Sequence, residues 1–167
     1  MVFQNPNWDW KTLNFDTGID FADKVLGTLN LPTNPNLKPF FDHGGKLLMY
    51  HGWSDGSSPE ESINYYKDVL KAVGSGAADS MRVFAIPGMS HCSGGLGCDT
   101  FDKLAILDHW VETDKAPDRI VASKLIGSKV IRTHPICTYP QVAKYSGTGS
   151  TDEAENFVCA DTDTAGK

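Results

Sequence analysis

The sequence predicts an α/β domain with a mainly parallel sheet and flanking helices. Two observations carry this prediction: short apolar runs alternate with segments of helical period from about residue 44 onward, and glycine or proline separates the segments. Alternating strand and helix patterns are typical of β-α-β units, whose right-handed crossovers give parallel strands. With 167 residues, the chain is long enough for one domain with its own core.

The first 43 residues form a loop-rich lead-in in this prediction. Prolines and asparagines are frequent there, and the one helical pattern runs from Asp20 to Leu29. Gly44 and Gly45 then precede the short apolar run 46–51, which predicts a buried strand.

The next two elements have clear boundaries in the sequence. Ser58 can cap a helix that has Pro59 in its first turn and ends at Gly74. Met81–Ile86 is the next predicted strand, and Pro87 ends it.

A helix and two short strands complete the predicted core. Thr100 can cap the helix, and residues 120–125 and 129–132 have strand patterns. The helix is expected to face inward with Leu104, Leu107, Trp110 and Val111. We therefore divide the chain into a lead-in (1–43), a βαβα core (44–132) and a C-terminal segment (133–167).

The candidate chemistry lies in the loops that follow the two predicted parallel strands. Asp55 comes four residues after His51, and His91 comes five residues after Ile86. Neighbouring parallel strands open on the same sheet edge, so the two side chains are expected to meet there. An ionised aspartate can orient a histidine ring and stabilise the imidazolium that forms when the ring takes a proton from a serine. In the simpler interpretation, Asp55 is a turn residue and His91 an ordinary loop histidine.

Two other residues near this edge have different expected roles. Ser54 lies in a G-x-S-x-G pattern, but a nucleophile elbow needs a helix directly after the serine, and here the helix begins about five residues later. Using Ser54 would also leave no clear acid between it and His91. His51 ends a buried strand and is expected to be a hydrogen-bonded structural histidine.

Several motifs together resemble one known family. The chain contains HGWSD at 51–55, PGMSHCSGG at 87–95 and RTHPICTYP at 132–140, with GGKLL at 44–48 and NFVC at 156–159. This combination, spread from about Trp8 to Cys159, resembles the tannase and feruloyl esterase family. The resemblance implies a partial α/β-hydrolase fold and ester hydrolysis through an acyl-enzyme, with Asp55 as the triad acid and His91 as the base. It implies no cofactor, and its substrates would be phenolic acid esters such as gallates or ferulates.

The four cysteines favour disulfides and an oxidising compartment, because their number is even and none lie in a C-x-x-C pair. Four unrelated thiols are the alternative. The resemblance implies a Cys137–Cys159 disulfide and a bond from Cys92 to a cysteine that precedes the nucleophilic serine. Cys98 could pair with Cys92 or stay free.

This chain departs from the family in a large region. Members carry an N-terminal half with the nucleophile and a lid domain, and neither is visible here. We therefore expect the C-terminal portion of a secreted serine esterase, inactive alone, whose partners are an aromatic ester and the missing half and lid. No signal peptide pattern is visible. A non-catalytic hydrolase-fold binding domain and a small esterase that uses Ser54 are the alternatives.

Other classes of function are disfavoured. A net charge of −6 argues against nucleic acid, and no apolar run reaches membrane-spanning length. The histidines and the N-terminal aspartates show no metal-ligand spacing.

Overall fold

The computed structural model describes residues 2–30 and 33–162, and the chain divides into two compact units after Asn34. The first unit contains a short 3₁₀ turn, η1 (Trp10–Thr12), and helix α1 (Gly18–Asn30). Two of its aromatic side chains stack on Phe3, whose ring centroid lies 4.3 Å from that of Trp8 and 5.7 Å from that of Phe21. The helix pattern at 20–29 is therefore confirmed.

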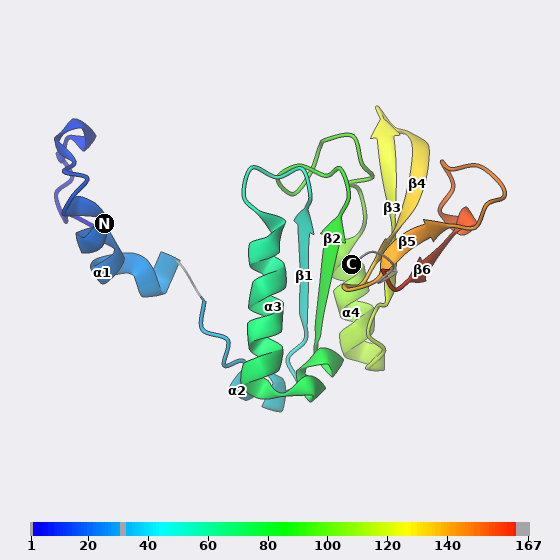
Figure 1. The fold of residues 1–167 in the computed structure, drawn as a ribbon, viewed down its shortest axis with the longest axis horizontal. Coiled ribbons are helices and arrows are strands. Elements are labelled where there is room, and N and C mark those ends of the chain that lie inside the picture. Colours follow the sequence, from blue (N-terminus) through cyan, green and yellow to red (C-terminus); the bar gives the residue numbers. More distant parts are fainter. Residues whose placement is uncertain (1, 31–32, 163–167) are drawn as a thin grey trace, which may run out of the picture. The chain divides into compact units, whose positions relative to one another are not determined.

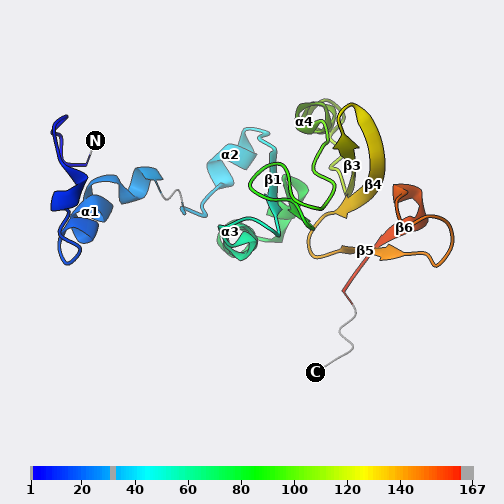
Figure 2. The same cartoon turned by 90° about the horizontal axis from the view of Figure 1, so that it is seen from above.

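The second unit begins with a short helix, α2 (Lys38–Asp42), which the sequence analysis did not predict. Strand β1 (Leu47–Gly52), helix α3 (Pro59–Val73) and strand β2 (Met81–Ile86) follow, with a 3₁₀ turn, η2 (Ser75–Asp79), between the last two. The two strands pair in parallel, as predicted. Figures 1 and 2 show α3 on one side of this strand pair and α4 (Lys103–Thr113) on the other.

Alternation of side chains along β2 produces the two halves of the core. Met81 and Val83 pack with Val69 of α3, whereas Phe84 and Ile86 belong to a second buried cluster on the opposite face. Because successive residues of a strand point to opposite faces, one apolar strand can serve both layers.

Helix α3 begins and ends at the predicted signals. The Ser58 hydroxyl oxygen accepts a hydrogen bond from the Glu60 backbone N–H at 3.3 Å. The helix ends at Val73, and Gly74 is its C-cap residue. Gly74 has a φ of 106°, which glycine adopts without strain and other residues do not.

The prediction for α4 was partly wrong. Asp102 caps this helix instead of Thr100, because the backbone of Thr100 pairs with that of Ser123. Trp110 is fully buried, but Leu104 and Val111 are 78% and 54% exposed. Trp110 lies about a third of a turn away from Leu104 and Val111 around the helix, so burying Trp110 leaves these two residues outward.

The expectation of a mainly parallel sheet is not met among the described residues. Apart from β1–β2, the strands form antiparallel pairs: β3 (Arg119–Ile126) with β4 (Lys129–Cys137), and β5 (Val142–Tyr145) with β6 (Phe157–Ala160). Only two residues join β3 to β4, and such a link permits a hairpin but no parallel crossover. The turn η3 (Ala154–Asn156) leads into β6, and a Cys137–Cys159 disulfide joins β4 to β6.

Candidate functional site

The parallel pairing of β1 and β2 brings two loops together at one sheet edge. These are the Asp55 loop (53–58), which follows β1, and the His91 loop (87–97), which follows β2. The backbone N–H groups of Trp53 and Ser54 donate to the carbonyls of Ile86 and Met89 at 2.9 and 3.0 Å. A Cβ atom at Gly52 would overlap the backbone oxygens of Met89 and Ser90. Glycine at this position therefore allows the two loops to touch.

The two predicted side chains meet at this edge. His91 Nδ1 lies 2.8 Å from Asp55 Oδ2, within the range expected for a hydrogen bond between them. The Asp55 side chain is 6% exposed, whereas that of His91 is 81% exposed. A shielded carboxylate thus holds Nδ1 of an imidazole that is otherwise open to solvent.

Hydrogen bonds keep Asp55 in its ionised form. The Ser57 backbone N–H donates to Asp55 Oδ1 at 2.9 Å. This bond first, and then the hydrogen bond from His91, hold the pKa of Asp55 below its usual range, and burial opposes them. An ionised Asp55 requires the proton of His91 on Nδ1, which leaves Nε2 free to accept one.

A second histidine lies against the same carboxylate. His51 Nε2 is 3.3 Å from Asp55 Oδ2 but is buried without a hydrogen-bond partner, so the contact is close without having hydrogen-bond geometry. The other ring nitrogen, Nδ1, lies 2.8 Å from the hydroxyl oxygen of Ser62 on α3. The expectation of a hydrogen-bonded histidine is confirmed, but the approach to Asp55 was missed. The four-residue spacing between His51 and Asp55 was the only signal for it.

A charged pair from distant parts of the sequence fixes the His91 loop. Asp99 accepts the backbone N–H of Gly94 at 2.6 Å and lies 3.3 Å from Lys124 Nζ. Lys124 also donates to the carbonyl of Gly95 at 2.7 Å. We call Asp99 and Lys124 the loop clamp. The sequence did not predict it, since no local motif links a loop aspartate to a lysine on β3.

The cysteines are in two states. Cys137 and Cys159 form the disulfide that the resemblance implied, with Cα atoms 5.6 Å apart. Cys92 is exposed and Cys98 is buried, and both are free thiols, so they are not joined to one another. Burial raises the pKa of the Cys98 thiol.

Ser54 does not have the setting of a nucleophile. Helix α3 starts at Pro59, and Ser54 is not one of the residues with positive φ, so it lacks the strained turn directly before a helix. Within residues 2–30 and 33–162, no side chain hydrogen-bonds to His91 Nε2.

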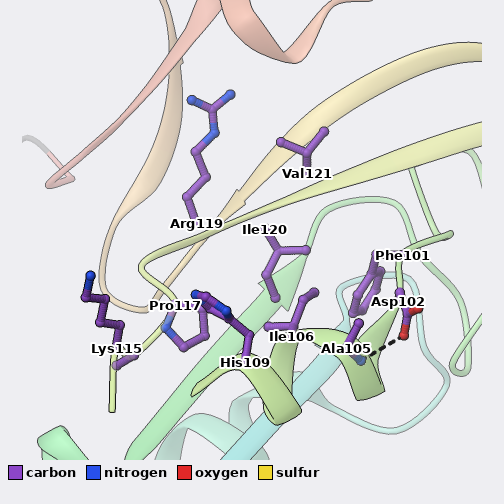
Figure 3. Close-up of a pocket in the computed structure, with 11 residues that line it drawn as sticks. Phe101, Asp102, Ala105, Ile106, His109, Lys115, Pro117, Arg119, Ile120 and Val121 are labelled. Atoms are coloured by element: carbon purple, nitrogen blue, oxygen red, sulfur yellow. Dashed lines mark hydrogen bonds between the residues drawn. The ribbon is translucent and has the colours of Figure 1, made fainter. Parts of the chain in front are cut away.

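Of two cavities in the second unit, only one borders this edge. One of about 270 Å³ is lined by Trp53 of the Asp55 loop and Pro87 of the His91 loop, together with residues of β4 and β5. The other, of about 550 Å³, lies between α4 and β3 and excludes Asp55 and His91 (Figure 3). Figure 3 shows Asp102 at one end of it and Lys115 and Arg119 at the other.

In the part of the chain that the structure describes, no group of three or more His, Cys, Asp or Glu side chains is placed to hold a metal ion. The helices described there are all too short or too polar to cross a membrane.

Comparison with known proteins identifies relatives of this chain. A sequence model of a family described as tannase and feruloyl esterase matches residues 1–160. Mono(2-hydroxyethyl) terephthalate hydrolase of Piscinibacter sakaiensis is 46% identical over 132 residues, which cover 77% of this chain and 22% of that protein. A probable feruloyl esterase of Arthroderma benhamiae is 35% identical over 171 residues. This alignment covers 94% of this chain and 31% of that protein.

Two solved structures of other proteins also resemble this chain. Feruloyl esterase B from Aspergillus oryzae superposes with a TM-score of 0.77 at 33% identity, covering 95% of this chain and 35% of that structure. Tannin acyl hydrolase from Aspergillus niger, at 23% identity and a TM-score of 0.70, shares the fold. The chain spans between about a fifth and a third of the length of these relatives.

Proposed function

Because the chain belongs to the tannase and feruloyl esterase family, we propose that it supplies the acid and the base of a serine carboxylic ester hydrolase. One observation carries the proposal: the shielded Asp55 carboxylate hydrogen-bonds to Nδ1 of the exposed His91 at 2.8 Å. An acid that orients a base at the carboxyl ends of parallel strands is the second half of a Ser–His–Asp triad.

In the proposed reaction, His91 Nε2 takes the proton of a serine hydroxyl as the serine oxygen attacks the ester carbonyl. Asp55 stabilises the resulting imidazolium through Nδ1. The imidazolium then gives its proton to the leaving alcohol, and an acyl-serine forms. Water, deprotonated by His91, releases the acid in a second round.

We propose that the serine and the oxyanion-hole donors come from residues outside this chain. The open Nε2 of His91 supports this, as does the setting of Ser54, which lacks an elbow. Cys92 would form a disulfide with a cysteine next to that serine, and its exposed free thiol beside His91 is available for such a bond. The lid domain of the family would complete the pocket.

The proposed substrates are esters of aromatic acids. Names of the relatives, which include feruloyl esterases and a terephthalate ester hydrolase, support this class. Trp53 is half-exposed in the Asp55 loop and lines the cavity of about 270 Å³ there, so it could contact an aromatic ring. We also propose a secreted protein, since its disulfide is typical of oxidising compartments.

The test is a polypeptide that contains this chain together with the segment encoded upstream of it. We expect it to hydrolyse methyl ferulate or methyl gallate. Asp55→Asn is expected to lower kcat by about 10⁴-fold, and His91→Ala by about 10⁶-fold. Ser54→Ala is the matched control and should keep full activity.

Other results would favour the alternatives. Loss of activity in Ser54→Ala would support the small esterase that uses Ser54. An intact, folded longer protein that binds aromatic esters without turnover would support a non-catalytic binding domain.

A further inference from the structure

We propose that His51 is a positioning residue for Asp55, donating its Nε2–H to the same carboxylate oxygen that accepts the hydrogen bond of His91. The inference deepens the proposed function and rests on it for its catalytic meaning. Its structural content, the direction of one proton, can be tested without turnover.

The starting observation is a buried polar atom without a partner. His51 Nε2 is shielded from solvent and makes no hydrogen bond, although Asp55 Oδ2 lies 3.3 Å away. The His51 side chain is 19% exposed and that of Asp55 is 6% exposed. Leaving a buried polar group unpaired is unfavourable, so a nearby acceptor attracts an N–H at this place.

The tautomer of His51 follows from its two neighbours. A proton on Nδ1 alone would point at Ser62 and leave the Nε2 lone pair facing a carboxylate inside the protein, which is repulsive. A proton on Nε2 points instead at Asp55, and the Ser62 hydroxyl, which can donate as well as accept, gives its hydrogen to Nδ1 at 2.8 Å. Of the two neutral tautomers, only the second satisfies both ring nitrogens, and a doubly protonated ring would carry the same proton on Nε2.

The resulting chain runs from Ser62 through His51 and Asp55 to His91. A small rotation of the His51 ring or of the carboxylate converts the 3.3 Å contact into a hydrogen bond, and contacts of this kind commonly tighten when a site is completed. Ser57 already fixes the other carboxylate oxygen. With donors on both oxygens, the carboxylate cannot turn away from His91.

The first measurement determines the proton position directly. Long-range ¹H–¹⁵N correlation spectra of the 167-residue chain at neutral pH distinguish a protonated from an unprotonated ring nitrogen. A proton on His51 Nε2 is expected. A ring protonated on Nδ1 alone would overturn the proposal.

The second measurement compares two substitutions that keep different halves of the ring's contacts. The amide of His51→Gln reaches the place of Nε2, whereas that of His51→Asn reaches only the place of Nδ1. Asp55 is followed by ¹³C titration of its carboxyl group. We expect the pKa of Asp55 to stay close to the wild-type value in His51→Gln and to rise in His51→Asn, because only the second loses a donor to the ionised form.

Equal titration of Asp55 in His51→Asn and the wild type would overturn the proposal, since His51 would then only join β1 to α3. These outcomes are separate from failure of the proposed function, which is measured by ester turnover. If neither variant folds, the proton position in the wild type still decides.

Discussion

At the scale of single residues, the site depends on the contrast between Asp55 and His91. The carboxylate is shielded and receives donors on both of its oxygens, while the imidazole that it orients is open to solvent. No side chain among the described residues hydrogen-bonds to Nε2 of this imidazole, as the proposed role of a base requires before a serine reaches it. Two consequences concern individual side chains.

Acid should destabilise the fold through Asp55. Its folded pKa lies below the reference value of 3.8, mainly because of the Ser57 N–H and then the His91 hydrogen bond. The stability from this difference is fully present above the unfolded pKa and is lost as the pH falls through the lower folded pKa. We expect the free energy of unfolding, measured in urea from about pH 5 to pH 2, to fall less steeply in Asp55→Asn. Asp68→Asn, a change at an exposed position of α3, is the control and should show the pH dependence of the wild type. An Asp55→Asn profile that runs parallel to the wild-type profile would contradict this expectation.

The two free thiols should react at very different rates. Cys92 is exposed, whereas Cys98 is buried and its thiol has a raised pKa. Only a small fraction of Cys98 is therefore present as the reactive thiolate. Alkylation of the native chain followed by peptide mapping is expected to modify Cys92 first and Cys98 only after unfolding. Rapid modification of Cys98 in the native chain would contradict the buried position of this side chain. Cys137 and Cys159 should resist alkylation until a reductant is added.

The sequence allowed prediction of the Asp55–His91 pair because each residue directly follows a recognisable strand. It did not allow prediction of the His51 contact, which depends on how a ring turns at the end of β1, or of the loop clamp. Lys124 and Gly95 are 29 residues apart and meet only through the packing of β3 against the His91 loop. Such contacts have no local pattern.

At the scale of elements, the β1–α3–β2 unit is the part that local signals determined. Caps and apolar runs gave its boundaries, and its parallel pairing follows from the crossover helix. The hairpin β3–β4 was underestimated, because β4 continues through His134-Pro135 to Cys137, and proline argues against a strand. The outward face of α4 was also misjudged, since both faces carry apolar residues.

The loop clamp should hold the His91 loop in place. Lys124→Met removes the contacts to Asp99 and the Gly95 carbonyl. The Lys124 and Asp99 side chains are only 20% and 14% exposed, so the substitution leaves a largely shielded carboxylate without its cation, and the free energy of unfolding should fall by about 1–3 kcal/mol. Amide hydrogen exchange of residues 91–97 should become faster by more than this global change accounts for, since local opening depends on local contacts. Lys129→Met, an exposed change on β4, serves as the control. Unchanged amide exchange of residues 91–97 in Lys124→Met would mean that backbone contacts within the loop keep it in place without the loop clamp.

The disulfide should stabilise the C-terminal strands. Its cysteines are 22 residues apart, and closing a loop of this size lowers the entropy of the unfolded chain by an amount worth about 3 kcal/mol. We expect the double change Cys137→Ala/Cys159→Ala to lower the free energy of unfolding by about that amount in a denaturant titration. Cys92→Ala keeps the disulfide and should be nearly neutral. A loss below about 0.5 kcal/mol in the double variant would contradict the estimate.

At the scale of the whole molecule, the chain contains the acid and the base of the proposed site but no hydroxyl bound to the base within its described residues. His91 Nε2 faces outward, and Ser54 lacks the geometry of an elbow. If the serine and the oxyanion donors lie outside this chain, as we propose, no acyl-enzyme can form on the chain alone. The charge of the transition state would also lack donors that are each worth about 10²–10³ in rate.

The isolated 167-residue chain should therefore hydrolyse p-nitrophenyl, methyl ferulate and methyl gallate esters little faster than buffer does. A fluorophosphonate probe, which labels only activated serines, should leave it unlabelled, because labelling needs a base in contact with a hydroxyl. His91→Ala is the control for both assays and should match the unaltered chain. Turnover or labelling that His91→Ala and Ser54→Ala both abolish would make Ser54 the nucleophile of a self-contained esterase. Turnover lost in His91→Ala and kept in Ser54→Ala would show that another serine of the chain reaches His91. No turnover and no labelling would agree with the proposal that a second segment brings the serine to His91, because neither reaction can then proceed on this chain alone.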